Sequence, residues 1–342
     1  MIGSLLASIP APSKISFPGF GIDEFVLDPV AFRIPLFWTD GEKHPIMWYG
    51  ILITLAMIVG FVVAYRKSKF EGIKSDDLFD LAIYLIIAAI VGARLYYVLS
   101  EPQKYDSFYD VIAIWNGGLG IYGGVMAGAA TILVFSKIKK IKTAKLLDVA
   151  APGLIIGQVI GRWGNFFNAE AYGAVTELPW RMGIAHGYWA DEACTQVVYG
   201  ATQYHHPTFL YELLWNLIGF ILIMSFYKKK KYDGAPTLWY LVWYGFGRFF
   251  IEGLRTDSLY FLPSVLGQTV RKSQLVAALC VVGGIALMII CGIRAKRAKQ
   301  DAVEYAPVYL ENTEEAVKEA DVPATEENES EAKVEDTETN EE

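Results

Sequence analysis

Apolar residues are gathered into long blocks along this 342-residue chain, and short polar segments separate the blocks. A helix needs about 20 predominantly apolar residues to cross the hydrocarbon core of a bilayer. Seven blocks approach that length, at about 46–65, 78–99, 118–136, 146–163, 208–227, 236–254 and 274–293. The pattern therefore predicts an all-α polytopic membrane protein with seven transmembrane helices.

Basic residues set the expected orientation, because Lys and Arg are retained on the cytoplasmic side during membrane insertion. Clusters of Lys and Arg follow the first, third, fifth and seventh blocks, whereas the alternate loops hold fewer of them. The sequence therefore predicts an N-terminus outside the cell and a C-terminus inside it. Residues 1–45 are then expected to form an extracytoplasmic N-terminal arm.

Composition adds a separate acidic tail to this picture. The formal net charge is −7, but residues 301–342 contain sixteen Asp and Glu against two Lys, so the membrane part is net positive. A highly charged segment with few aromatic and branched apolar residues cannot build a core. We predict that residues 296–342 form a disordered cytoplasmic tail, and an acidic docking segment is the alternative.

The three cysteines give no framework for a fold or a metal site. Cys280 and Cys291 are eleven residues apart in one predicted helix, which separates them by about 16 Å along its axis. Cys194 stands alone in a predicted outer loop. We therefore expect neither a disulfide nor a metal cluster.

Polar and ionisable residues inside the blocks fall almost entirely in their outer halves. Arg94, Arg162 and Arg248 lie near the outer ends of the second, fourth and sixth blocks. His206 and Glu212 flank the start of the fifth block, at residue 208. An Arg or Asp at the centre of a membrane helix costs about 2.5–3.5 kcal/mol on insertion scales, so such groups usually pair or bind a substrate. The pattern predicts a functional site in the outer half of the membrane.

Each of these residues also has a simpler interpretation. Arg248 and Glu252 are four residues apart and could form a structural ion pair. Arg94 could extend to the membrane surface, and a His-His-Pro loop more often forms hydrogen bonds than a metal site. Three arginines against few acids nevertheless indicate a surplus of positive charge. Guanidinium groups suit phosphate oxygens, so we predict an anionic ligand.

Two other classes of seven-helix protein compete with an enzyme. A retinal-binding receptor needs a lysine in its last span, and residues 274–293 contain none. A transporter for an anionic solute is harder to exclude, because arginines near glycine-rich helices also suit anion passage. The one-sided distribution of polar groups and the lack of a visible inverted repeat argue against it.

Residues 161–173, Gly-Arg-Trp-Gly-Asn-Phe-Phe-Asn-Ala-Glu-Ala-Tyr-Gly, resemble the signature of the prolipoprotein diacylglyceryl transferases of bacterial plasma membranes. Further matches in the same order are Trp48-Tyr49-Gly50, Gly92-Ala93-Arg94, Thr176-Glu177-Leu178-Pro179-Trp180, His206-Pro207-Thr208, Tyr211-Glu212 and Arg248-Phe249-Phe250-Ile251-Glu252. The resemblance covers about residues 44–295 and leaves the acidic tail outside.

The resemblance implies a multi-pass transferase of lipoprotein biosynthesis in the bacterial plasma membrane, with its active site toward the outer leaflet. Such an enzyme moves the diacylglyceryl group of phosphatidylglycerol onto the lipobox cysteine of a preprolipoprotein, forming a thioether and releasing glycerol 1-phosphate. Its partners would be phosphatidylglycerol, preprolipoprotein signal peptides and the bilayer. No metal, cofactor or nucleic acid is expected.

The same resemblance divides the chain into parts. Residues 46–295 would form the seven-helix membrane domain, and residues 171–205 its small extracytoplasmic head between the fourth and fifth helices. The Gly, Pro and aromatic content of this head predicts short strands and turns.

The expected roles follow from the two problems of this reaction. As the C–O bond breaks, the phosphate gains negative charge, and fixed guanidinium groups stabilise that charge in the transition state. We assign this role to Arg162 and Arg248. Glu170 and Glu252 would orient the two arginines, and the Asn165 amide would donate to the phosphate or glycerol oxygens. Arg94 is a weaker third candidate for binding the phospholipid.

The second problem is the cysteine thiol, which is mostly protonated at neutral pH and must lose its proton. Many members of the family resembled have a histidine after the glycine-rich start of the third helix, and Tyr122 stands in that place here. Tyrosine is a poor base unless cations lower its pKa. Otherwise Tyr122 orients the thiol, and His206 or a carboxylate takes the proton. Tyr49 and His206 are also expected to line the site that binds phosphatidylglycerol.

Overall fold

The structure is a computed structural model, and it gives side-chain detail up to residue 299. It describes residues 10–35, 43–105, 107–114, 117–191, 196–256 and 271–320. The predictions for the first nine residues, for Cys194 and for the tail from residue 321 lie outside the described residues. The chain divides into two compact units, residues 1–292 and residues 293–342.

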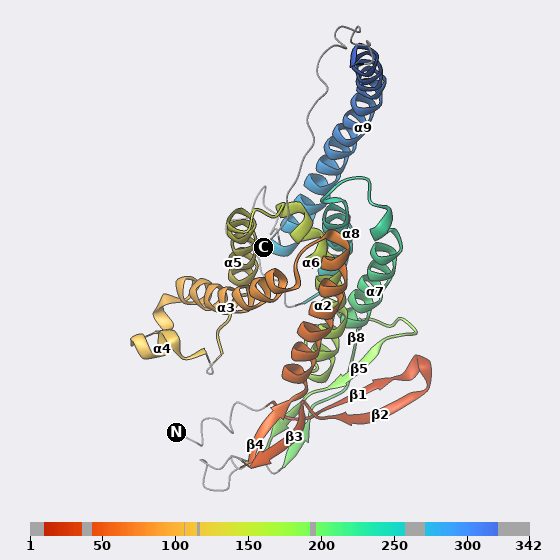
Figure 1. Ribbon diagram of the computed structural model, residues 1–342. Helices are drawn as coiled ribbons and strands as arrows, with labels where there is room; N and C mark the ends of the chain where they lie inside the picture. Colours follow the sequence, from red (N-terminus) through yellow and green to blue (C-terminus); the bar gives the residue numbers. More distant parts are fainter. Residues whose placement is uncertain are drawn as a thin grey trace, which may run out of the picture. The chain divides into compact units, whose positions relative to one another are not determined.

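Seven long helices dominate the described part of the chain (Figure 1). They are α2 (Trp48–Glu71), α3 (Ser75–Ser100), α5 (Ile121–Ile138), α6 (Thr143–Phe167), α7 (Thr208–Phe226), α8 (Ala235–Leu254) and α9 (Lys272–Ala320). Shorter helices are α4 (Phe108–Ile112), η1 (Pro18–Phe20), η2 (Pro102–Lys104) and η4 (Tyr227–Lys229). Within the described ranges, six of the long helices are long and apolar enough to cross a membrane. The predicted polytopic membrane protein is thereby confirmed.

Helix α8 is not among these six, although it forms where the sixth apolar block predicts a helix. Its tyrosine, tryptophan and glycine residues are only weakly apolar, and it carries both Arg248 and Glu252. Its composition is therefore that of a helix shielded by others. It packs against α6 and α7, and both of these helices are apolar enough to span.

The fold is mostly helical, as predicted, but it is not all-α, because the N-terminal arm and the head contain strands. Four of the strands form one antiparallel sheet in the order β2-β1-β5-β8. These strands are β1 (Ser13–Phe17), β2 (Ile22–Leu27), β5 (Met182–Ala185) and β8 (Gln203–His205). The arm and the head thus share a sheet, in which Ile15 pairs with Ile184. Pairing between such distant segments leaves no local pattern in the sequence, whereas the strands predicted within the head are confirmed.

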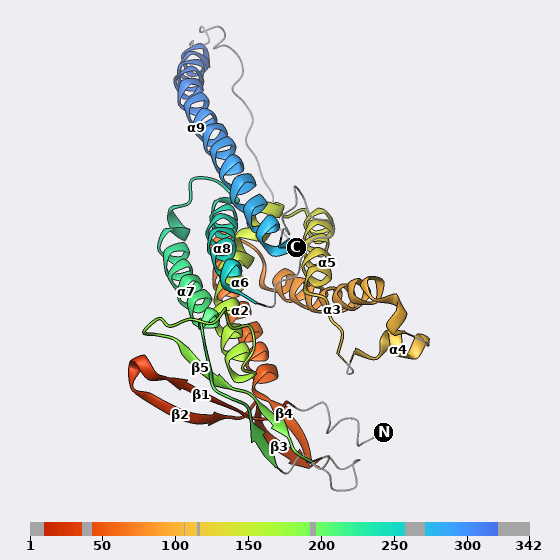
Figure 2. The same ribbon diagram turned by 180° about the vertical axis from the view of Figure 1, so that it is seen from behind.

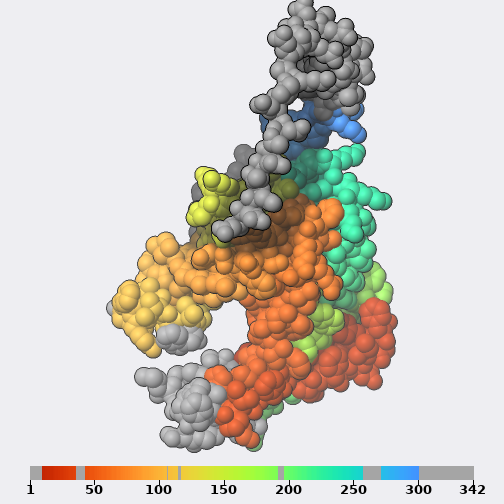
Figure 3. All heavy atoms as spheres, in the orientation of Figure 1, coloured from red at the N-terminus to blue at the C-terminus, as the bar shows by residue number. Residues whose placement is uncertain are grey.

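Two further hairpins complete the β structure. Strand β3 (Val30–Pro35) pairs with β4 (Lys43–Met47), and β6 (Gly187–Trp189) pairs with β7 (Val197–Tyr199). Strand β4 leads without a break into α2, because Met47 is the N-cap residue of that helix. Figure 3 shows the residues of the N-terminal strands adjoining the start of α2. The strand region is therefore tied to the helices at the end where α2 begins.

A small apolar core joins the shared sheet to the ends of α6 and α7. Ile15, Met182 and Ile184 of the sheet are buried together with Phe209 of α7, and Phe166 and Phe167 of α6 pack against them. The residues that follow the end of α6 and precede the start of α7 are thus held against a folded support. These are the residues that surround the candidate site.

Glycines allow the helices to approach closely where the site requires it. A Cβ on Gly153 of α6 would lie 2.6 Å from the carbonyl oxygen of Gly60 in α2, so neither residue can carry a side chain without a shift. Further along the same pair, the Tyr49 ring covers Gly164, where a Cβ would lie 2.6 Å from the Tyr49 Cδ2 atom. These close contacts bring α2 beside the signature on α6.

Buried charge is also present at the opposite end of α6, so the prediction that polar groups gather on one side is only partly right. Asp148 is fully buried and accepts hydrogen bonds from the backbone N–H of Gly234 and from both donors of Thr237. The Lys230 ammonium lies 2.9 Å from Asp148 and 2.8 Å from Glu71. These contacts join α2, α6 and the start of α8. These contacts were not predicted from the sequence, because each of the residues lies in or next to a polar loop that is expected to be exposed to solvent.

Helix α9 continues to Ala320 as a single helix (Figure 2). The first part of the segment predicted to be disordered is therefore helical. The physical reason is its alanine and glutamate content, because both residues have a high helix propensity.

Candidate functional site

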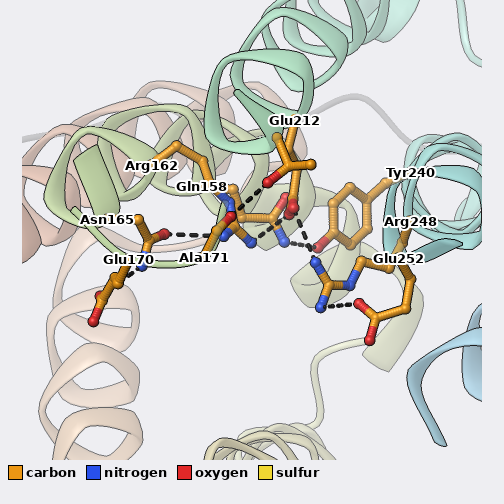
Figure 4. Close-up of polar contacts among 10 residues, drawn as sticks. Gln158, Arg162, Asn165, Glu170, Ala171, Glu212, Tyr240, Arg248 and Glu252 are labelled. Atoms are coloured by element: carbon orange, nitrogen blue, oxygen red, sulfur yellow. Dashed lines mark hydrogen bonds and ion pairs between the residues drawn. The ribbon is translucent and has the colours of Figure 1, made fainter. Parts of the chain in front are cut away.

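Arg162 lies near the C-terminal end of α6 and is the first member of a polar cluster between three helices (Figure 4). Its Nη1 donates to the Asn165 Oδ1 oxygen at 2.9 Å, and its Nη2 lies 2.5 Å from the Glu212 Oε1 oxygen. The first contact spans three residues of one helix, and the second crosses to α7. Arg162 is therefore fixed in two directions.

Glu212 is the centre of this cluster. Its second carboxylate oxygen, Oε2, accepts from the Arg248 Nη1 nitrogen at 3.0 Å, so one carboxylate joins an arginine of α6 to an arginine of α8. The Glu212 side chain is only 3% exposed. Sequence reasoning placed this residue at the start of the fifth span but did not assign it to the site. The signal that could have found it is a carboxylate inside an otherwise apolar helix.

Arg248 and Glu252 form the ion pair that their spacing predicts. The Arg248 Nη2 nitrogen lies 2.7 Å from the Glu252 Oε2 oxygen, one turn along α8. Arg271, just before α9, donates through its Nη1 to the backbone carbonyl oxygen of Glu252. The local ion pair and the shared carboxylate therefore act on the same guanidinium, and the structure brings Arg162, Arg248 and Glu252 together.

Glu170 joins the cluster indirectly, through Asn165. The Asn165 Nδ2 donates to the Glu170 Oε1 oxygen at 2.9 Å, while its Oδ1 accepts from Arg162. Ala169 and Ala171 on either side have φ angles of 48° and 57°, which is a left-handed conformation that L-residues other than Asn and Asp rarely adopt. Strain of this kind often marks a functional turn. Here it turns the exposed Glu170 back toward the end of α6.

Tyr49 and Tyr122 lie near different members of the cluster. Tyr49 begins α2, covers Gly164 and lies close enough to interact electrostatically with Glu170 and Arg162. Tyr122 begins α5 and interacts in the same way with Arg248 and Glu252. Each tyrosine is thus associated with a different arginine.

Arg94 is not brought into the cluster. Its guanidinium donates to the backbone carbonyl oxygens of Asp110, Val111, Ala113, Gly117 and Gly118 at 2.5–3.3 Å. Gly117 and Gly118 have φ angles of 84° and 79°, a conformation that suits glycine and turns these carbonyls toward α3. The geometry of Arg94 is that of a residue which holds the loop between α3 and α5.

His206 lies just before α7 and contacts Tyr211 rather than the arginines. The His206 Nδ1 atom and the Tyr211 hydroxyl are 3.2 Å apart, and the same hydroxyl accepts from the Trp180 Nε1 at 2.7 Å. Burial, followed by the nearby His205, lowers the pKa of His206 below its usual value. The lowered pKa favours the neutral imidazole and makes it a weaker base.

The charges within the cluster are balanced, so the expected surplus of positive charge is wrong. Glu212 and Glu252 face the two arginines, as a buried charge requires a partner. The guanidiniums are not fully enclosed, since Arg162 remains 18% exposed and Arg248 16%. A guanidinium carries five donors, and the described side-chain contacts use two nitrogen atoms of each. The shared Glu212 carboxylate holds both guanidinium groups in position, so a phosphate can bind between them.

The sequence was also compared with known proteins. The profile of the family described as prolipoprotein diacylglyceryl transferase matches residues 35–290. The phosphatidylglycerol–prolipoprotein diacylglyceryl transferase of Acaryochloris marina is 45% identical over 66% of this chain and 81% of its own length. That of Finegoldia magna is 43% identical over 77% of this chain and 95% of its own length. That of Streptococcus pyogenes serotype M5 is 41% identical over 76% of this chain and 94% of its own length.

Proposed function

Because the chain belongs to the prolipoprotein diacylglyceryl transferase family, we propose that it transfers the diacylglyceryl group from phosphatidylglycerol to the lipobox cysteine thiol of preprolipoproteins. The cysteine sulfur attacks the glyceryl carbon and forms a thioether bond as the C–O bond breaks. The electron pair of that bond leaves with glycerol 1-phosphate, and the thiol proton passes to a base. This reaction begins the maturation of a bacterial lipoprotein.

The observation that carries the assignment of roles is the pair of arginines on Glu212. Two guanidiniums from α6 and α8 are held on one carboxylate before substrate arrives, so they need little reorganisation when the phosphate gains charge. Arg162 and Arg248 would bind and stabilise the leaving phosphate. Asn165 would donate to it, Glu170 and Glu252 would orient the donors, and Tyr49 would line the lipid side of α2.

Substrate would reach this site from the outer leaflet of the plasma membrane. Many large apolar side chains are exposed on α2, α3, α5 and α9, as expected of surfaces that face lipid. Loops rich in Lys and Arg lie at the opposite end from the signature. In this arrangement α8 also crosses the membrane, as the sixth of seven spans, and the N-terminus is outside. Residues 46–295 form the catalytic domain, with the strand-built head on its outer side.

Tyr122 provides a direct test of the proton acceptor. If its hydroxyl takes the thiol proton, Tyr122→Phe lowers kcat by about 100-fold, within the range of general-base catalysis. The measurement is the rate of thioether formation as a function of pH, with Tyr96→Phe, the neighbouring tyrosine 6.2 Å away by ring centroids, as the matched control. Full activity of Tyr122→Phe would leave the proton to His206 or to a carboxylate.

The proposed function is tested with right-side-out vesicles that contain phosphatidylglycerol and the purified protein. We expect a lipobox peptide added outside to become diacylglyceryl-modified, with one glycerol 1-phosphate released per thioether. The control peptide has serine in place of the cysteine and should release none. Flux of an anionic solute without this release would contradict the proposal and would favour the transporter.

A further inference from the structure

A layer of neutral polar side chains lies one helical turn from the arginine cluster, on the side that faces away from the head. Asn216 follows Glu212 by four residues on α7, and Gln158 precedes Arg162 by four on α6. The level of the layer is fixed from both sides, because Arg162 contacts Glu212 above it and Ile155 lies against Gly219 below it. Gln158 and Asn216 therefore occupy the same depth between α6 and α7.

The layer extends to α8 through Tyr240. The Gln158 Nε2 donates to the Tyr240 hydroxyl at 2.9 Å. Figure 4 shows the Tyr240 hydroxyl directed toward Gln158. The same three helices that supply the ion-paired cluster thus supply the neutral layer.

Several polar atoms of this layer have no protein partner. Asn216 is fully buried, and both its Nδ2 and its Oδ1 lack a hydrogen-bond partner among the described residues. The Gln158 Oε1 oxygen is also buried without one. An unpaired amide inside a membrane protein is strongly unfavourable, because no bulk water is available to replace the missing bonds. The whole Asn216 amide and the Gln158 carbonyl oxygen, unpaired at one depth among the described residues, indicate a ligand.

The chemistry of these amides restricts the ligand to a neutral group that both donates and accepts hydrogen bonds. Hydroxyl groups meet this requirement. A cationic head group would find no carboxylate in this layer and two guanidiniums directly above it. Four helical residues correspond to a rise of about 6 Å, a distance that a three-carbon head group can span from a phosphate held by the arginines.

We propose that Gln158 and Asn216 form a hydroxyl-binding site that receives the glycerol head group of the phospholipid and so selects phosphatidylglycerol. The site rests on the proposed function, because it places the substrate phosphate at Arg162 and Arg248. Gln158 and Asn216 determine specificity: they bind the part of the substrate that leaves, while the arginines act on the bond that breaks.

The test compares phosphatidylglycerol with phosphatidylpropanol, whose head group has the same three carbons but no free hydroxyl. We expect the wild-type enzyme to prefer phosphatidylglycerol by about 10- to 100-fold in kcat/KM, because a site built to bind hydroxyls rejects an analogue without them. Asn216→Leu should lower kcat/KM for phosphatidylglycerol by about the same factor and leave phosphatidylpropanol within about threefold. Gln158→Leu should act in the same direction and provides a second variant.

Thermal unfolding separates this role from a structural one. Replacing an unpaired buried amide by an apolar side chain of similar size removes a desolvation penalty, so Asn216→Leu should unfold at the same or a higher temperature than the wild type. Gln274→Leu is the control, because its amide joins α9 to the Phe249 carbonyl outside the layer. Its lipid preference should equal that of the wild type.

Two results would overturn the hydroxyl-binding site. One is equal use of both lipids by the wild type. The other is an equal loss of activity on both lipids in Asn216→Leu and Gln158→Leu, which would mean that the layer holds bound water or only supports the fold. A wild-type enzyme that releases no glycerol phosphate from phosphatidylglycerol with a lipobox peptide would instead contradict the proposed function.

Discussion

Arg162→Ala and Arg248→Ala are each expected to reduce the turnover of phosphatidylglycerol by at least about 100-fold, the scale of losing one preorganised donor from a transition state. Each substitution removes one of the two guanidiniums that Glu212 holds together. The remaining arginine cannot hold the phosphate from both sides. The loss should fall on kcat as well as on kcat/KM, because the charge on the leaving oxygen develops only as the bond breaks.

The measurement is the initial rate of glycerol 1-phosphate release with saturating lipobox peptide. Arg181→Ala is the matched control: this arginine lies on the head, where its Nη1 donates to the Glu177 carbonyl oxygen, and its loss should change the rate by less than about threefold. Arg162→Lys and Arg248→Lys should retain more activity than the alanine variants but less than the wild type, because an ammonium group cannot bind a phosphate through two parallel hydrogen bonds. Variants that fold and turn over at near-wild-type rates would remove the arginines from the mechanism.

The parts of this site that were predictable from sequence are those encoded within one segment. Arg162, Asn165 and Glu170 fall within a single signature, and their contacts link residues three and five positions apart. The Arg248 and Glu252 pair follows from the four-residue spacing on one helix. Helix periodicity states which residues share a face, and that is sufficient for such contacts.

The contacts that were missed lie between segments. Nothing in the spacing of α7 shows that Glu212 turns toward α6 and α8, because the rotation of a helix is set by packing against its neighbours. The pairing of Ile15 with Ile184 is of the same kind. Arg94 shows the reverse error: its residue type suggested a ligand for phosphate, whereas the positive φ angles at Gly117 and Gly118 offer it carbonyl oxygens instead.

Glu212→Gln tests the residue that sequence reasoning did not assign. The substitution keeps the shape of the side chain and removes the charge that both arginines share. Breaking a buried ion pair by removing one partner typically costs about 3–5 kcal/mol, because the other charge is left uncompensated. With only 3% exposure at Glu212, solvent can screen little of that loss. We expect a lower unfolding temperature. Turnover should fall by at least about 10-fold, because the two guanidinium groups lose the carboxylate that positions both of them.

An added anion should distinguish an anion-binding pair of arginines from a purely structural one. A ligand that binds only the folded state stabilises it by an amount that grows with the logarithm of its concentration divided by Kd, so we expect glycerol 1-phosphate to raise the unfolding temperature. Without the Glu212 charge, the phosphate becomes the only anion shared by both guanidiniums, while Glu252 still pairs with Arg248, and Glu212→Gln should gain more stability from the phosphate than the wild type does. Glu177→Gln, an exposed residue of the head, is the matched control and should behave as the wild type. An unfolding temperature of Glu212→Gln that does not respond to glycerol 1-phosphate would show that the cluster holds the helices together but does not receive the phosphate.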